Sequence, residues 1–196
     1  MSGFSADWLA LREAADTAAR SEAVLDAARR TFAHHTGDPL EIWDLGSGTG
    51  ASVTAFSALF PKPQVWHLVD TDADNLKRAM ARYAGDNAFA EVRLETHMHD
   101  LADNPAPWPS SAHLVTATAL FDLVSESWLQ AFADRLCAAR LPLLATLTYD
   151  GRLELEPAHS MDASMIEAFN QHQRTDKGFG PAAGPDASNV LTTALE

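Results

Sequence analysis

The chain has 196 residues, which is enough for one α/β domain with a sizeable core. Its 27 acidic residues outnumber 14 basic ones and give a net charge of −13 at pH 7. A field of that sign repels phosphate backbones and anionic lipids, so we expect neither a nucleic acid nor a membrane partner. No apolar run reaches the roughly 18 residues that span a bilayer, and the first residues do not read as a signal peptide.

The single cysteine, Cys137, excludes an internal disulfide and a cysteine metal site. It lies in an amphipathic run, where we expect it to be buried as a small hydrophobic residue. Together with the opening residues, this cysteine usage predicts a cytoplasmic protein.

Hydrophobic spacing predicts an alternation of helices and strands. Residues 7–35 repeat apolar side chains at helical spacing and are expected to form one or two helices, which end near Gly37. Asp72 is expected to cap a later helix. The elements expected after residue 39 are strands at 40–45, 64–69, 92–97, 113–118 and 141–149, and helices at 51–59, 72–85 and 125–140. This alternation predicts an α/β fold, a Rossmann-like three-layer sandwich whose mostly parallel sheet has helices on both faces.

A glycine-rich turn is the strongest motif. It follows the first strand, opens a helix and reads Asp44-Leu45-Gly46-Ser47-Gly48-Thr49-Gly50. Glycines there let a ligand approach the backbone, and the helix N-terminus offers free N–H groups to an anionic group. For S-adenosylmethionine (SAM), that group is the methionine carboxylate.

A dinucleotide is the alternative ligand, because Gly46, Gly48 and Ala51 also fit the looser NAD fingerprint. Asp44 favours SAM, since a carboxylate two residues before the first glycine suits an α-ammonium group and does nothing for a pyrophosphate. Gly50, which gives the motif the pattern G-x-G-x-G, and the helical segment before the first strand also favour SAM over a dinucleotide.

Other cofactor contacts are expected where later strands end. Asp70, followed by Thr71, can accept hydrogen bonds from both ribose hydroxyls, in NAD as well as in SAM. Asp100 can accept from the adenine amino group while Leu101 packs on the ring. His97 and His99 alternate on a strand, but without a fixed third ligand we expect no metal.

These residues together resemble the class I SAM-dependent methyltransferases over residues 40 to 148. The run from Asp44 to Gly50 resembles their first motif, and Asp70 and Asp100 match their ribose and adenine acids. The resemblance adds Ala117, at the end of the fourth strand, to the cofactor site. Three further stretches resemble a subgroup of small bacterial methyltransferase-like proteins, for which no substrate is implied: Trp8–Glu13, Phe121–Ser125 and Asp176–Gly180.

The family pattern also implies a division of the chain into three segments, and the chain departs from that pattern in one respect. We expect a helical lid at 1–37, the SAM-binding core at 38–149 and a substrate or lid segment at 150–196. The family's C-terminal β-hairpin has no counterpart here, so we expect a truncated or shortened variant. The apolar edge of the fifth strand should then be covered by the segment after Tyr149 or by a second chain, as in a homodimer.

The expected activity is methyl transfer to a small-molecule acceptor. Two alternatives stay open: a SAM-binding protein without transferase activity, and an NAD(P)-dependent oxidoreductase. The resemblance places acceptor groups above the fourth and fifth strands and under the N-terminal helices. The candidates for catalysis there are Asp122, Tyr149 and His159, and the candidates for substrate binding are Arg12 and Arg20.

Overall fold

The computed structural model describes residues 5–196, apart from the side chain of Ala6, so the first four residues of the expected lid segment lie outside it. The chain forms two compact units. The larger unit contains residues 5–118 and 140–147, and the smaller one contains residues 119–139 and 148–196. The expected boundaries after residues 37 and 149 stay predictions.

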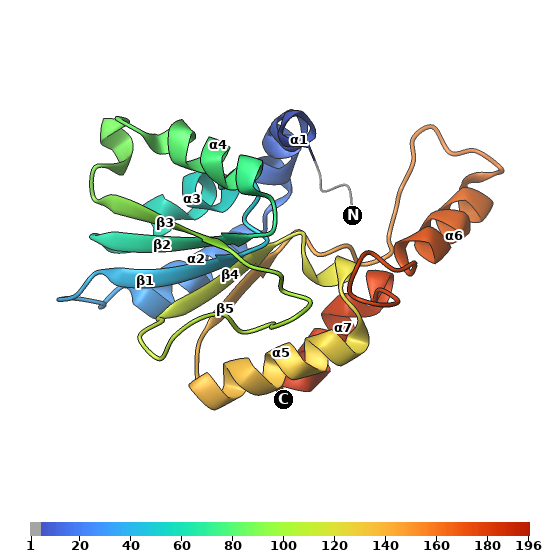
Figure 1. Cartoon of the computed structure of the whole chain (residues 1–196). Helices are drawn as coiled ribbons and strands as arrows, with labels where there is room; N and C mark the ends of the chain where they lie inside the picture. Colours follow the sequence, from blue (N-terminus) through green and yellow to red (C-terminus); the bar gives the residue numbers. More distant parts are fainter. Residues whose placement is uncertain (1–4) are drawn as a thin grey trace. The chain divides into compact units, whose positions relative to one another are not determined.

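A five-stranded sheet forms the centre of the larger unit (Figure 1). All four strand pairings are parallel, and the strand order is β3-β2-β1-β4-β5. The predicted α/β Rossmann-like fold is therefore confirmed, with a sheet that is parallel throughout. The strands are β1 (Leu40–Leu45), β2 (Gln64–Asp70), β3 (Val92–Met98), β4 (Leu114–Thr118) and β5 (Leu143–Thr146).

The last strand is shorter than the nine residues expected. Pro142 has no N–H to donate to a ladder, and Leu147 adopts a left-handed φ of 59°, which ends the extended conformation. Among residues 5–196, β5 pairs only with β4. What covers the outer edge of β5 stays a prediction.

Three helices pack on one face of the sheet and form the main core with it. They are α2 (Glu22–Phe32), α3 (Ala51–Phe56) and α4 (Ala73–Tyr83). Alternate strand residues such as Ile42, Trp66 and Leu68 meet the helix residues Phe56 and Ala79 there. Asp72 caps α4 as predicted, because its side chain accepts from the N–H groups of Asp74 and Asn75 at 2.9 Å and 3.1 Å.

The N-terminal region forms two helices, α1 (Ala6–Ala19) and α2, and the chain is extended at Arg20 between them. Ser5 caps α1 by accepting from the N–H of Trp8 at 3.3 Å. A 3-10 turn, η1 (Ser57–Leu59), extends α3 to the end of the helix predicted there, and a second one, η2 (Asn87–Phe89), precedes β3.

The smaller unit is helical. It contains η3 (Phe121–Leu123), α5 (Glu126–Ala139), α6 (Asp162–Gln173), η4 (Gly184–Asp186) and α7 (Ala187–Leu195). The sequence did not predict α6, because this helix has no buried residue and hence no clear apolar stripe. Within residues 5–196, no helix is both long and apolar enough to cross a membrane.

Cys137 corrects one expectation, since its side chain is exposed. The buried stripe of α5 is formed by Trp128, Leu129, Phe132, Ala133 and Leu136. Leu136 lies near the middle of this stripe, and a helix turns about 100° per residue, so the next side chain, that of Cys137, points away from it.

Each passage of the chain from one unit to the other coincides with a residue in the left-handed region. Ala119, Arg140 and Leu147 have φ values of 53°, 54° and 59°. Residues other than glycine adopt this conformation at a cost. Elsewhere in the described chain, positive φ angles belong to glycines.

Candidate functional site

The glycine-rich turn leads from β1 into α3 through three left-handed glycines. Gly46, Gly48 and Gly50 have φ values of 63°, 53° and 78°. A Cβ on Gly50 would come within 3.2 Å of the Tyr83 ring, so this position also needs glycine for packing. A Cβ on Gly48 would lie 3.1 Å from Cδ1 of Leu9, which shows that α1 covers the turn.

Asp70 joins the end of β2 to this turn. Its Oδ2 accepts from the N–H of Gly48 at 2.8 Å, and its Oδ1 accepts from the N–H of Asp72 at 2.9 Å. Burial raises the pKa of Asp70, and hydrogen bonds from the backbone of Asp72 and Gly48 partly offset this effect. The glycine-rich turn and the carboxylate at the end of β2 are thus in direct contact. Each oxygen of Asp70 can still accept a hydrogen bond from a hydroxyl group.

Asp44 lies at the centre of the site and is almost completely buried, with 1% of its surface exposed. Its Oδ1 accepts from the hydroxyl of Thr116 at 2.7 Å, whereas Oδ2 has no hydrogen-bond partner of ordinary geometry among residues 5–196. Burial raises the pKa of Asp44 to about 7, although the hydroxyls of Thr116 and Ser52 lower it. A buried carboxylate oxygen without a donor is costly, and a cationic ligand group would remove that cost.

Arg20 provides the complementary charge at the end of α1. It is 8% exposed, its guanidinium lies 5.3 Å from the ring centre of Phe56, and within the described chain its Nε has no acceptor. Burial lowers the pKa of Arg20, and the nearby carboxylates of Asp16, Glu13 and Asp44 raise it. A ligand that carries an ammonium and a carboxylate on one carbon would satisfy Asp44 and Arg20 together.

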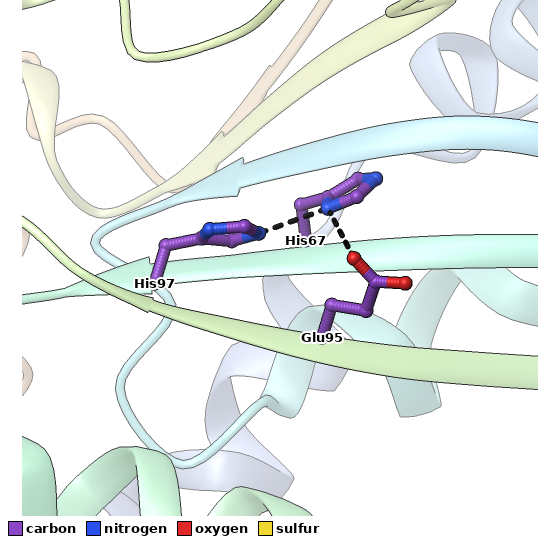
Figure 2. Close-up of side chains that lie close together, drawn as sticks. All are labelled: His67, Glu95 and His97. Carbon is purple, nitrogen blue, oxygen red and sulfur yellow. Dashed lines mark hydrogen bonds and ion pairs between the residues drawn. The ribbon is translucent and has the colours of Figure 1, made fainter.

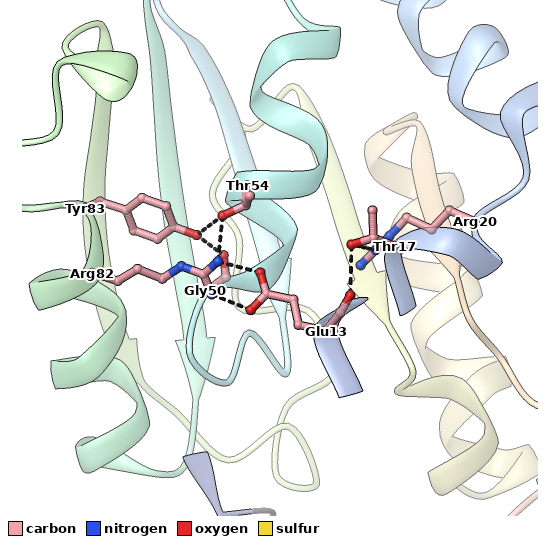
Figure 3. Close-up of polar contacts among 7 residues, drawn as sticks. All are labelled: Glu13, Thr17, Arg20, Gly50, Thr54, Arg82 and Tyr83. Atoms are coloured by element: carbon pink, nitrogen blue, oxygen red, sulfur yellow. Dashed lines mark hydrogen bonds and ion pairs between the residues drawn. The ribbon is translucent and has the colours of Figure 1, made fainter. Parts of the chain in front are cut away.

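A polar network ties α1 to the glycine-rich turn (Figure 3). The hydroxyl of Tyr83 donates to the carbonyl of Gly50 at 2.6 Å and lies 2.8 Å from the hydroxyl of Thr54. Arg82 donates to the same Thr54 hydroxyl at 3.0 Å and forms a two-pronged ion pair with Glu13 at 3.0 Å and 2.5 Å. The network therefore connects α1, α3 and α4 at the turn.

Other predicted cofactor residues of the larger unit differ in exposure. Ser47, Leu101 and Ala117 are buried, while Gly46, Thr71 and Asp100 are exposed. Asp100 follows β3, and its Oδ1 accepts from the N–H of Ala102 at 2.9 Å. Arg12 pairs with Asp16 at 2.8 Å and stacks over Trp8, and its role in substrate binding stays a prediction.

The candidates for catalysis belong to the smaller unit. Asp122 is buried within η3. The Tyr149 hydroxyl donates to Oδ1 of Asn170 at 2.6 Å. His159 is exposed, and its Nδ1 accepts from the N–H of Met161 at 3.1 Å. Their roles stay predictions.

Six polar residues of the site were not found from the sequence: Glu13, Ser52, Thr54, Arg82, Tyr83 and Thr116. A threonine inside the buried strand β4 was the one usable signal, since a polar side chain there needs a partner. Glu13 and Tyr83 reach the turn only through tertiary packing, which spacing along the chain does not reveal.

Comparison with known proteins supports the fold. No protein-family model matches the sequence, and no curated protein matches it. A structure of Haemonchus contortus phosphoethanolamine N-methyltransferase 2 with S-adenosyl-L-methionine is similar, with a TM-score of 0.51 and 18% identity over 89% of this chain and 36% of that one. Human N-acetylserotonin methyltransferase with SAM has a TM-score of 0.50 and 12% identity over 96% of this chain and 48% of that one.

At such identities the likeness establishes a shared fold. The chain has the fold of SAM-dependent methyltransferase structures and spans less than half the length of these two.

Proposed function

We propose that the protein binds SAM and transfers its methyl group to a small-molecule acceptor. One observation carries the proposal: Asp44 Oδ2 and Arg20 Nε are buried polar atoms of oppositely charged groups, and neither has a hydrogen-bond partner of ordinary geometry in the described chain. The α-amino acid end of SAM carries the ammonium and the carboxylate that would complete both.

The remaining parts of the site fit the nucleoside. Asp70 retains acceptor capacity for the ribose hydroxyls, and we assign Asp100 and Leu101, which follow β3, to the adenine. NAD fits less well, because a buried carboxylate beside the glycine-rich turn would repel a pyrophosphate and Asp44 would stay without a partner. The methyltransferase folds of the two similar structures, both with SAM bound, support the same choice.

In this mechanism the residues of the chain bind the cofactor and orient it. SAM supplies an electrophilic methyl group on a sulfonium. Asp44 and Arg20 hold the amino acid end, Asp70 fixes the ribose, and α1 over the turn excludes water. Alignment for an in-line displacement then requires no acid or base from the larger unit, unless the acceptor arrives protonated.

Calorimetric titration with S-adenosylhomocysteine tests the cofactor. Asp70→Asn removes a charge-assisted acceptor and is expected to weaken binding by about 10- to 100-fold. Asp72→Asn is the matched control, since asparagine also caps helices well and binding should stay unchanged. Tighter binding of NAD than of SAM in equilibrium dialysis would reject the proposal.

A SAM-binding protein without transferase activity is the second candidate. Two of the catalytic candidates are already hydrogen-bonded within the chain, which favours this second function. Tyr149 bonds to Asn170, and His159 accepts from a backbone N–H group. Incubation of the chain with labelled SAM and a metabolite extract separates the two functions. Label in a small molecule supports transfer, and bound cofactor without any labelled product supports the second candidate.

The wider setting follows from composition and is part of the proposal. A net charge of −13 disfavours nucleic acid and anionic membranes as partners. We place the protein in the cytoplasm on its single cysteine, and we propose a homodimer as one way to cover the edge of β5.

A further inference from the structure

We propose that the larger unit holds a second site, a binding site for a divalent transition metal ion formed by His67, Glu95 and His97 (Figure 2). The three residues come from the adjacent strands β2 and β3, and one ligand atom of each lies within 4.8 Å of the others. The site is independent of the proposed cofactor function, and it departs from the expectation that no metal is bound.

Strand register places these side chains together. His67 pairs with Glu95 across the β2–β3 ladder, and His97 is two residues further along the same strand as Glu95. Side chains two apart on a strand share a face, so all three project from one face of the sheet. That face lies opposite the core, because the core residues Trp66, Leu68 and Leu94 alternate with them.

The hydrogen bonds determine which nitrogen atoms face the site. Nε2 of His67 lies 2.6 Å from Oε2 of Glu41 on β1. A carboxylate can only accept, so Nε2–H donates to Glu41, and Nδ1 is the nitrogen of His67 that faces His97. A histidine whose second nitrogen is held by a carboxylate is the usual arrangement of a metal ligand.

The two imidazoles face each other, with the carboxylate of Glu95 beside them (Figure 2). His67 Nδ1 lies 2.9 Å from His97 Nε2 and 3.5 Å from Glu95 Oε2. Tetrahedral zinc with bonds of about 2.0–2.1 Å needs its nitrogen ligands ~3.4 Å apart, so the pair must open by about half an ångström. Metal binding would require both facing nitrogens to be free of a proton, so His97 would carry its proton on Nδ1.

The surroundings restrict both rings and leave an entry path. Trp43 stacks on His67 with a centroid separation of 4.4 Å and on His97 with 4.8 Å, which fixes the ring planes. The side chain of His67 is 11% exposed and that of Glu95 is 41% exposed, so an ion can enter from the side of Glu95. Two nitrogens and one carboxylate suit zinc or a similar ion and leave a coordination position for water.

Titration of the full chain, without a histidine tag, with Co²⁺ and then Zn²⁺ tests the site. We expect visible d–d bands that saturate at one Co²⁺ per chain and disappear when Zn²⁺ is added. Mg²⁺ prefers a shell of oxygens and should not displace cobalt. Absence of the bands at one equivalent would overturn the proposal.

Variants locate the ion. We expect His97→Gln and Glu95→Gln each to weaken zinc binding by at least about ten-fold, and Glu41→Gln, which acts through His67, by about 10- to 100-fold. His99→Gln is the matched control, because His99 follows the strand and bonds to the carbonyl of Asn104 at 3.0 Å. Unchanged affinity in folded His97→Gln and Glu95→Gln, or an equal loss in His99→Gln, would refute the site. Circular dichroism of each metal-free variant checks that it is folded.

Discussion

At the scale of single residues, Asp44 is the most informative side chain. Its burial, with a smaller contribution from the nearby charge of Asp70, raises its pKa to about 7, far above that of an exposed aspartate. A carboxyl group in this state destabilises the free protein whenever it is ionised. The same property makes it a strong partner for a cation, so the site is arranged for binding at the expense of stability.

Replacement of Asp44 should therefore stabilise the free protein in a pH-dependent way. A raised pKa means that the folded state keeps its proton while the unfolded chain loses it, so stability falls as the pH rises from about 4 to about 7. Asp44→Asn has no such loss. Urea unfolding at pH 4.5, 6 and 8 should give a gain that grows to a few kcal/mol at most.

The control for this experiment is Asp134→Asn on the exposed surface of α5, which should show no such pH trend. A gain from Asp44→Asn that is the same at all three pH values would contradict the assigned pKa. Weaker binding of S-adenosylhomocysteine to the same variant is expected, because the ammonium partner is lost.

At the scale of elements, an ion pair helps to hold α1 over the glycine-rich turn. Most side chains of this helix are exposed, and Leu9 is half-buried where it meets Gly48. The two-pronged pair between Glu13 and Arg82 is therefore expected to contribute to holding the helix.

Arg82→Lys keeps the charge but loses the planar fork, so α1 should open more often. We expect faster amide hydrogen exchange over α1, and S-adenosylhomocysteine binding that is weaker by a few-fold, which corresponds to about 0.5–1 kcal/mol. Arg78→Lys is the matched control, because Arg78 is 62% exposed and reaches Asp7 only at 3.7 Å. Identical exchange in the two variants would show that the fork does not hold the helix.

The elements also show how far the sequence can predict the site. Strands β1 and β2 and the cap at Asp72 were predictable because short apolar runs bounded by turn residues and capping chemistry are local signals. The contact between Gly48 and Asp70 followed from parallel strand ends meeting at one edge of the sheet. The role of Glu13 was not predictable, since its partner Arg82 is 69 residues away.

The proposed metal-binding side chains show the same limit of prediction from sequence. From the sequence, His97 was paired with His99, because alternation places both on one face of a single strand. The structure ends β3 at Met98 and pairs His97 with His67 on the neighbouring strand instead. Cross-strand register decides which histidines meet, and only the folded sheet provides that information.

At the scale of the whole molecule, the negative charge should act on the cofactor. SAM carries a sulfonium and is a net cation, whereas S-adenosylhomocysteine is neutral overall. A chain with a net charge of −13 attracts the cation over a distance that salt screens. The two ligands therefore respond differently to ionic strength, although both occupy the same proposed site.

Titrations at about 0.02 M and about 0.3 M salt can measure this difference. We expect the affinity for SAM to fall by a few-fold at the higher salt, and the affinity for S-adenosylhomocysteine to change less. Parallel salt dependence of the two ligands would show that the overall charge does not contribute to cofactor binding.

The path of the chain has a practical consequence for anyone dividing this protein. The fifth strand of the sheet is encoded after α5, so the segment 119–139 interrupts the larger unit in the gene. Cutting the chain after Thr118 would delete an edge strand and expose the hydrogen-bonding groups of β4. A stable fragment of the larger unit therefore needs a designed linker that replaces residues 119–139 and a new terminus after Leu147.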